Sequence, residues 1–131
     1  MTSKGEGKII NLLNHAGIHY EREKTFGDLR HGLYRFDFYI PNLNGRKVVI
    51  EVNGMQHYSQ IARFHKTRKD FLAAQERDRR KISYCLANGI EIYCLPYWVL
   101  DDIKSLSDVF VSTYLARDRW KNDNDWREHK Q

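Results

Sequence analysis

Two neighbouring strand-like segments, each with one acid among apolar residues, constrain the fold more than any other feature of this chain. The first reads YRFDFYI over residues 34–40, and the second reads KVVIEV over residues 47–52. Both are rich in aromatic and β-branched residues, which favour strands, whereas acidic residues are depleted in strands. The connecting residues PNLNGR contain Asn-Gly, a strong turn signal, so the sequence predicts an antiparallel hairpin that carries two acids.

The apolar residues of the two segments determine the register that we predict for this hairpin. Successive strand residues point to opposite faces, so a slip by one residue would bury Glu51 beside Phe38. The predicted register places Asp37 directly opposite Glu51, with Cβ atoms about 4.5–5.5 Å apart. A two-residue turn at Asn44-Gly45 has the wrong parity for it, so we expect an odd-length loop or a bulge there. The apolar face is continuous when three pairs form: Phe36 with Val52, Phe38 with Ile50, and Ile40 with Val48.

Two carboxylates that face each other repel, which destabilises a hairpin unless a positive charge lies close to both of them. A divalent cation is one solution, because Mg²⁺ commonly binds one or two carboxylates and keeps several waters. The alternative is a solvated face on which each acid pairs with a basic side chain, such as Arg35, Lys47 or a helix arginine. Both interpretations of Asp37 and Glu51 stay open at this point.

The remaining segments complete one domain of the α/β class, in an α+β arrangement with the order αβββαβα. A chain of 131 residues is long enough to bury a core of its own. We expect the domain to cover residues 1–120, with a polar tail over residues 121–131. The further predicted elements are a helix over 3–16, an edge strand over 18–26, a helix over 69–87, a strand over 90–95 and a helix over 106–120.

The charge of the chain points to a polyanionic partner. It holds 22 Lys and Arg against 17 Asp and Glu, a net charge of +5, and the basic residues cluster between positions 63 and 81. Such a stripe is typical of a surface that neutralises nucleic-acid phosphates, so we predict DNA as the partner. The predicted DNA contacts are Arg63, Lys66, Arg68, Lys69, Arg77, Arg79 and Arg80.

Other features limit the class of protein. The longest apolar runs are too short to cross a bilayer, and the N-terminal MTSKGEGK leads into an amphipathic pattern that is no signal sequence. Cys85 and Cys94 lack metal-motif spacing, so we expect them to be reduced thiols of the core. We therefore predict a cytoplasmic protein without a membrane partner.

The order of these motifs resembles the PD-(D/E)XK nuclease superfamily. A lone helix is followed by a strand with Asp, a hairpin, and a strand that reads apolar-Glu-x-x-Gly-x-x-His in IEVNGMQHY, residues 50–58. The resemblance covers about residues 6–98 and is greatest to the branch with very-short-patch repair endonucleases and small phage and homing-type nucleases. It implies a restriction-endonuclease-like mixed sheet with flanking helices, and hydrolysis of DNA phosphodiesters with Mg²⁺ or Mn²⁺.

The resemblance also implies roles for individual residues. Asp37 matches the acid of the first motif, Glu51 matches that of the second, and Glu6 matches an extra acid that many members bring to the metal. Glu6 also lies three residues after Ser3, and this capping-box spacing alone would explain it. The Lys expected two positions after Glu51, which orients or activates the attacking water, is Asn53 here. Three residues are candidates to replace that Lys: Gln56, His57 and Lys81.

Two other functions remain as alternatives to a simple endonuclease. A structure-selective Holliday-junction resolvase would use the same chemistry but would need a homodimer that places two sites on one junction. A catalytically silent DNA-binding module would keep the basic stripe without cleavage, and Asn53 in place of the motif Lys favours it. Metal-dependent cleavage separates the silent module from both nucleases.

Overall fold

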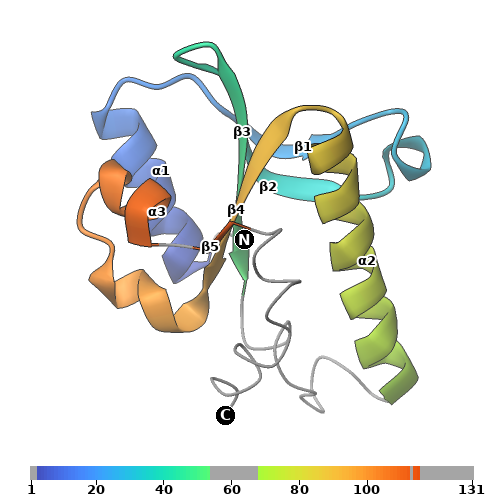
Figure 1. The fold of residues 1–131 in the computed structure, drawn as a ribbon. Coiled ribbons are helices and arrows are strands. Elements are labelled where there is room, and N and C mark those ends of the chain that lie inside the picture. Colours follow the sequence, from blue (N-terminus) through green and yellow to red (C-terminus); the bar gives the residue numbers. More distant parts are fainter. Residues whose placement is uncertain (1–2, 54–67, 113, 116–131) are drawn as a thin grey trace.

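A five-stranded mixed sheet, with helices on both faces, forms the centre of the computed structural model, which describes residues 3–53, 68–112 and 114–115. Its strand order is β1-β2-β3-β4-β5, with β3 and β4 parallel and the other neighbours antiparallel. Helix α2 covers one face, and α1 and α3 cover the other (Figure 1). The bounds are α1 Lys4–His15, β1 Glu21–Thr25, β2 Arg35–Leu43, β3 Arg46–Asn53, α2 Arg68–Ala87, β4 Ile90–Pro96, α3 Leu106–Ser112 and β5 Tyr114–Leu115, with short 3-10 helices η1 Arg30–Gly32 and η3 Tyr97–Asp102.

The hairpin of β2 and β3 has the predicted register at two of the three expected pairs, and the ladder does not include the third, Phe36 with Val52. Phe38 pairs with Ile50 and Ile40 pairs with Val48, and a bulge between Ile40 and Leu43 then shifts the ladder by one residue. The expected bulge is therefore confirmed, and it corrects the parity of a two-residue turn. Asn44 and Gly45 form that turn with φ of 54° and 85°, as a type I′ turn requires. The first strand, which we expected to end at residue 40, continues through the bulge to Leu43.

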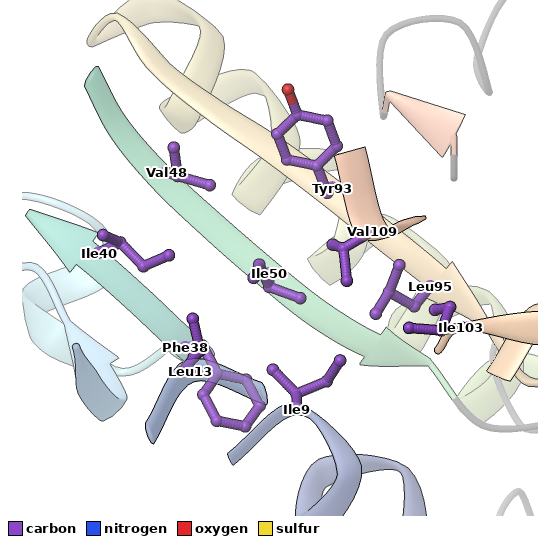
Figure 2. Close-up of a cluster of buried hydrophobic side chains, with 10 residues drawn as sticks. All are labelled: Ile9, Leu13, Phe38, Ile40, Val48, Ile50, Tyr93, Leu95, Ile103 and Val109. Atoms are coloured by element: carbon purple, nitrogen blue, oxygen red, sulfur yellow. The ribbon is translucent and has the colours of Figure 1, made fainter. Parts of the chain in front are cut away.

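Two clusters of buried side chains lie on the two faces of the sheet. The cluster under α1 and α3 is shown in Figure 2 and comprises Ile9, Leu13, Phe38, Ile40, Val48, Ile50, Tyr93, Leu95, Ile103 and Val109. The cluster under α2 includes Tyr39, Val49 and Ile82, and it also contains Phe36. The prediction that Phe36 shares a face with Phe38 is therefore wrong. The centres of the Phe26 and Phe36 rings lie 5.6 Å apart in an edge-on arrangement, and this contact helps to hold Phe36 in the second cluster.

The C-terminal end of the described chain departs from the predicted element order. The helix that we expected over residues 106–120 ends at Ser112, and β5 follows and pairs with β4 at Tyr93 and Cys94. The segment VFVSTYL, residues 109–115, is rich in β-branched and aromatic residues, which favours a strand over a further helical turn. The predicted tail over residues 121–131 lies outside the described residues.

Both cysteines are buried thiols that form no disulfide with each other, as predicted for reduced thiols of the core. Cys85 of α2 and Cys94 of β4 belong to the cluster under α2, and burial raises the pKa of the Cys85 thiol to about 12. A thiol with so high a pKa stays protonated at neutral pH and is a poor nucleophile. Within the described ranges, no helix combines the length and the apolar character that crossing a bilayer requires.

Candidate functional site

The two acids of the hairpin lie where the ladder of backbone hydrogen bonds between β2 and β3 ends. The ladder begins at the Phe38–Ile50 pair, and beyond it the carboxylates take over hydrogen bonds to the facing strand. The Asp37 N–H donates to Oε2 of Glu51 at 2.7 Å, and the Val52 N–H donates to Oδ2 of Asp37 at 2.8 Å. Each acid thus accepts a backbone hydrogen bond from the opposite strand, and this interlocking fixes both side chains side by side.

Glu51 is the most deeply buried charged residue in the described part of the chain, and Lys81 neutralises it. Lys81 extends from α2 and forms an ion pair with Oε1 of Glu51, and their side chains are only 13% and 9% exposed. The Lys81 Nζ also lies 4.9 Å from the centre of the Phe36 ring. Burial acts to lower the pKa of Lys81, but the charge and hydrogen bond of Glu51 outweigh it and raise that pKa. Lys81 is therefore firmly protonated.

Asp37 is in an unfavourable environment for a negative charge. Burial and the adjacent charge of Glu51 raise the pKa of the Asp37 carboxyl above its ordinary value of 3.8. The hydrogen bond from the Val52 N–H and the charge of Lys81 act in the opposite direction but are weaker, and Glu6 adds a small repulsion. One lysine therefore compensates only part of the negative charge that two ionised carboxylates would place here.

Glu6 approaches this pair from α1 but is engaged elsewhere. Its side chain accepts from the Ser3 N–H while Ser3 Oγ accepts from the Glu6 N–H, so the predicted capping box is present. Oε1 of Glu6 also forms a 3.4 Å ion pair with Nη2 of Arg22. Within the described ranges, no group of three or more His, Cys, Asp and Glu side chains is arranged to hold a metal ion. A three-acid site with Glu6 is therefore not formed in this arrangement.

A glycine allows the first turn of α1 to lie against the end of β3. A Cβ atom on Gly5 would come within 2.8 Å of Leu100 Cδ1 and 2.9 Å of Val52 Cγ1. The Lys8 Nζ donates to the Leu100 carbonyl at 2.7 Å and holds the same turn of α1 against η3. Close approach at Gly5 thus brings the neighbouring Glu6 to the side of the acid pair.

Several predicted site residues cannot be placed. Gln56, His57, Arg63 and Lys66 lie outside the described residues. The backbone of Asn53 ends β3 and pairs with Pro96, but its side chain also lies outside the description. Their predicted roles stay predictions. Of the three residues considered as replacements for the motif Lys, the structure brings Lys81 to the acids.

The basic residues of α2 lie mainly on its exposed surface. Arg79 and Arg80 line a groove of about 580 Å³ between α2 and residues 28–30. The Tyr84 hydroxyl crosses this groove and donates to Oδ1 of Asp28 at 2.7 Å. The exposed residues among the predicted DNA contacts are Arg68, Lys69, Arg77, Arg79 and Arg80.

Arg22 belongs to this neighbourhood although the sequence analysis did not single it out. It lies on the edge strand β1, pairs with Phe38 in the sheet, and contacts Glu6. In sequence it stands in the charged segment EREKT, residues 21–25, where nothing separates it from ordinary surface residues. The only available signal was that an edge strand pairs directly with the strand that carries Asp37.

The chemistry of the acid pair fits a divalent cation. Mg²⁺ and Mn²⁺ favour carboxylate oxygens, and Mg²⁺ sites commonly use one or two protein carboxylates together with waters and phosphate oxygens. Asp37 and Glu51 supply such a pair, and burial and then the charge of Glu51 raise the pKa of Asp37. These two residues would hold the cation.

The chain is similar to two viral proteins over part of its length. It is 40% identical over 65 residues to "Uncharacterized protein 307L" of Invertebrate iridescent virus 6, which is 50% of this chain and 32% of that protein. It is 41% identical over 56 residues to "Uncharacterized protein 094L" of Frog virus 3, which is 42% of this chain and 36% of that protein. The chain thus spans about a third of each relative. No family model and no solved structure matches the chain.

Proposed function

We propose that this chain is a metal-dependent DNA endonuclease of the PD-(D/E)XK type that hydrolyses phosphodiester bonds. The observation that carries the proposal is the meeting of Asp37, Glu51 and Lys81 at the end of the β2–β3 ladder. Two adjacent acids and one lysine are the residue types that the resembled family uses. A stable sheet needs none of them there, because apolar residues would fill the same positions without a desolvation cost.

Asp37 and Glu51 would hold Mg²⁺ or Mn²⁺, which polarises the scissile phosphate and lowers the pKa of a bound water. Their interlocked hydrogen bonds to the facing strand orient both carboxylates before any ligand arrives. Lys81 would serve from α2 in place of the lysine that the family has at position 53. Its protonated amine holds Glu51 and adds a positive charge where the transition state of phosphate hydrolysis gains negative charge.

The basic surface of α2 supports DNA as the substrate. Arg79 and Arg80 lie on the same helix as Lys81, so α2 carries both the basic surface and the lysine that reaches the acid pair. Contacts of this kind neutralise phosphates, so they contribute affinity and register without reading the sequence. A homodimer and a cytoplasmic location remain predictions.

One observation favours the silent DNA-binding module as a second candidate. Both oxygens of Glu51 are engaged, Oε1 with Lys81 and Oε2 with the Asp37 N–H. A closed ion pair of this kind can serve purely to neutralise a buried acid. In that case the basic face would bind DNA while Asp37, Glu51 and Lys81 did no chemistry.

Cleavage assays separate these candidates. Purified protein would be incubated with supercoiled, linear and four-way-junction DNA in Mg²⁺, Mn²⁺ or EDTA. We expect cleavage with metal and none in EDTA, and a loss of more than about 100-fold in Asp37→Asn, since even the outer partners of metal ligands matter by 10–100-fold. Glu91→Gln is the matched control, because it removes an exposed carboxylate on β4 and should cut normally.

The forms of DNA that are cleaved distinguish a junction resolvase from a general endonuclease. Cleavage of the junction alone would identify a resolvase, whereas cleavage of all three forms would identify a general endonuclease. DNA binding without cleavage under any metal would overturn the nuclease proposal and leave the silent module.

A further inference from the structure

We propose that Arg22 binds a phosphate of the DNA backbone at the rim of the acid pair, and that Glu6 competes with this phosphate for the guanidinium. The inference rests on the proposed function, because it places a DNA strand next to Asp37. It assigns a DNA contact on β1, in addition to the basic surface of α2. Two separate positive surfaces would then hold the strand.

The position of Arg22 is fixed by the sheet. β1 pairs with β2, and Arg22 lies opposite Phe38, the residue that follows Asp37. The guanidinium carbon of Arg22 lies 4.9 Å from the centre of the Phe38 ring, so the cation stacks on a buried aromatic side chain. Stacking on the ring restricts the Arg22 side chain, so an incoming phosphate has less side-chain freedom to order.

The hydrogen bonding of Arg22 is incomplete. Its Nη2 reaches Oε1 of Glu6 at 3.4 Å, which is long for a charged pair. Its Nε is buried and has no hydrogen-bond partner in the described part of the chain. A buried donor without an acceptor is costly, so the contact with Glu6 alone does not satisfy this side chain.

A phosphate would complete this hydrogen bonding. The guanidinium offers parallel N–H groups that match two phosphate oxygens, whereas Glu6 engages only one nitrogen. The Arg22 side chain is 31% exposed, so a modest rotation presents its Nε–Nη edge to a strand that lies at the surface. The contact that joins α1 to β1 through Glu6 leaves the Nε of Arg22 without an acceptor in the described part of the chain.

Glu6 connects this contact to the acid pair. Glu6 is the partner of Arg22, and the first turn of α1 that carries it lies against Val52, whose N–H donates to Asp37. An anion at Arg22 would therefore displace Glu6 from the guanidinium. Glu6→Gln removes this competitor and keeps the capping box, because Gln serves at the same position.

The test is DNA binding in EDTA, measured by fluorescence anisotropy with a short labelled duplex over a series of salt concentrations. We expect Arg22→Gln to weaken binding about tenfold, as for loss of one charged hydrogen bond, and to lower the salt slope by about one. Glu6→Gln should tighten binding. The matched control pair is Arg46 and Glu91, also an Arg–Glu ion pair between neighbouring elements, and Arg46→Gln and Glu91→Gln should bind as wild type.

Several results would overturn the inference. These are wild-type protein that does not bind DNA, unchanged affinity in Arg22→Gln, an equal loss in Arg46→Gln, or unchanged affinity in Glu6→Gln. If Arg22→Gln does not fold, Arg22→Lys replaces it, because it keeps the charge and the stem over Phe38. It should keep the salt slope but bind several-fold more weakly, and full affinity would contradict a guanidinium contact.

The assay separates this inference from the nuclease proposal because it excludes metal. Wild-type protein that binds through Arg22 but cuts nothing with Mg²⁺ or Mn²⁺ removes the nuclease proposal alone. Wild-type protein that cuts, with unaltered binding in Arg22→Gln, removes the Arg22 contact alone.

Discussion

Strand β3 carries an ion pair at each end, and the two pairs differ in almost every respect. At the turn end, Arg46 contacts Glu91 at 3.1 Å, and their side chains are 45% and 33% exposed. The Tyr93 hydroxyl donates to the same Glu91 at 2.8 Å, and water screens the group. At the other end, Glu51 and Lys81 are almost fully buried, and a second acid, Asp37, lies against them.

The difference between the two pairs separates an ion pair with little effect on stability from a group of charges that stability alone does not explain. The Arg46–Glu91 pair lies at the turn end of the hairpin and is open to water, so its removal should change stability little. At the buried end, carboxylates replace ladder hydrogen bonds, and a like charge adds repulsion. Taking charges out of water costs several kcal/mol per ion, which good pairing only repays. An arrangement that stability alone does not favour, placed beside a basic helix, is what a phosphodiester-cleaving site would require.

Replacing Lys81 and Arg46, one at a time, should give the largest difference in the free energy of unfolding between the two ends of β3. We predict that Lys81→Met lowers the free energy of unfolding by about 3–5 kcal/mol, because Glu51 is then left buried without its partner. Arg46→Met should lower it by less than about 1 kcal/mol, as for exposed pairs. Urea denaturation of both variants in EDTA measures the difference. Equal effects of the two substitutions would remove the distinction between the two ends of β3.

The pH dependence of stability should report the second acid at the buried end. Asp37 has a pKa near 3.8 when unfolded and about 8 in the metal-free fold, mainly because of burial and then Glu51. Its contribution is fully present below the lower value, where both states hold the proton. It is lost as the pH rises through the upper value, because only the unfolded state gives up the proton readily.

Asp37→Asn should therefore remove this part of the pH dependence. We expect the difference in the free energy of unfolding between the variant and wild type to shift in favour of the variant from pH 4 towards pH 8. The measurement is urea denaturation in EDTA at several pH values. A difference that stays constant over this range would show that Asp37 ionises as an ordinary carboxyl.

Two glycines of α1 test how closely this helix lies against the buried end of β3. Gly7→Ala has open space around the new methyl group and should stabilise the protein by up to about 1 kcal/mol through helix propensity. Gly5→Ala gains the same propensity but meets Leu100 and Val52 within 3 Å, so we expect net destabilisation by about 1 kcal/mol. Thermal melting of the two variants measures it, and stabilisation by both would contradict the close approach.

The smallest expected effect on the fold concerns the basic surface of α2. Replacing Arg79 and Arg80 together with Ala should weaken DNA binding similarly for all sequences and lower the salt slope by about one to two. Melting should change little, because both side chains are exposed. Anisotropy titrations over several salt concentrations measure the slope. An unchanged slope would move the DNA contact away from the groove at residues 28–30.

Local patterns were enough to predict the hairpin and its acids. The alternation in YRFDFYI and KVVIEV fixed the register, since only one pairing buries the apolar side chains, and that register brings Asp37 to Glu51. The order of periodic segments predicted the α/β class, and the family resemblance implied the mixed sheet with flanking helices. The face of Phe36 was predicted wrongly, because simple alternation does not hold beside a point where the ladder opens.

Long-range placement could not be predicted in the same way. Lys81 is 30 positions from Glu51, and nothing in the sequence gives the rotation of α2 about its axis, so Lys81 remained one candidate among three. Arg22 was missed because a charged edge strand resembles any solvated edge. The proposed role of each residue depends on a partner on another element, Glu51 for Lys81 and Glu6 for Arg22. Such contacts depend on how the helices pack on the sheet.

Calorimetric titration of Mn²⁺ into DNA-free protein tests the central claim most directly, namely that Asp37 and Glu51 form a metal site. Wild type and Glu91→Gln should bind Mn²⁺ with equal affinity, because Glu91 lies in the exposed pair at the far end of the sheet. Glu51→Gln should bind at least about tenfold more weakly, since it removes one of the two charged ligands. Equal affinity in Glu51→Gln and wild type, or no binding by wild type, would contradict the assignment.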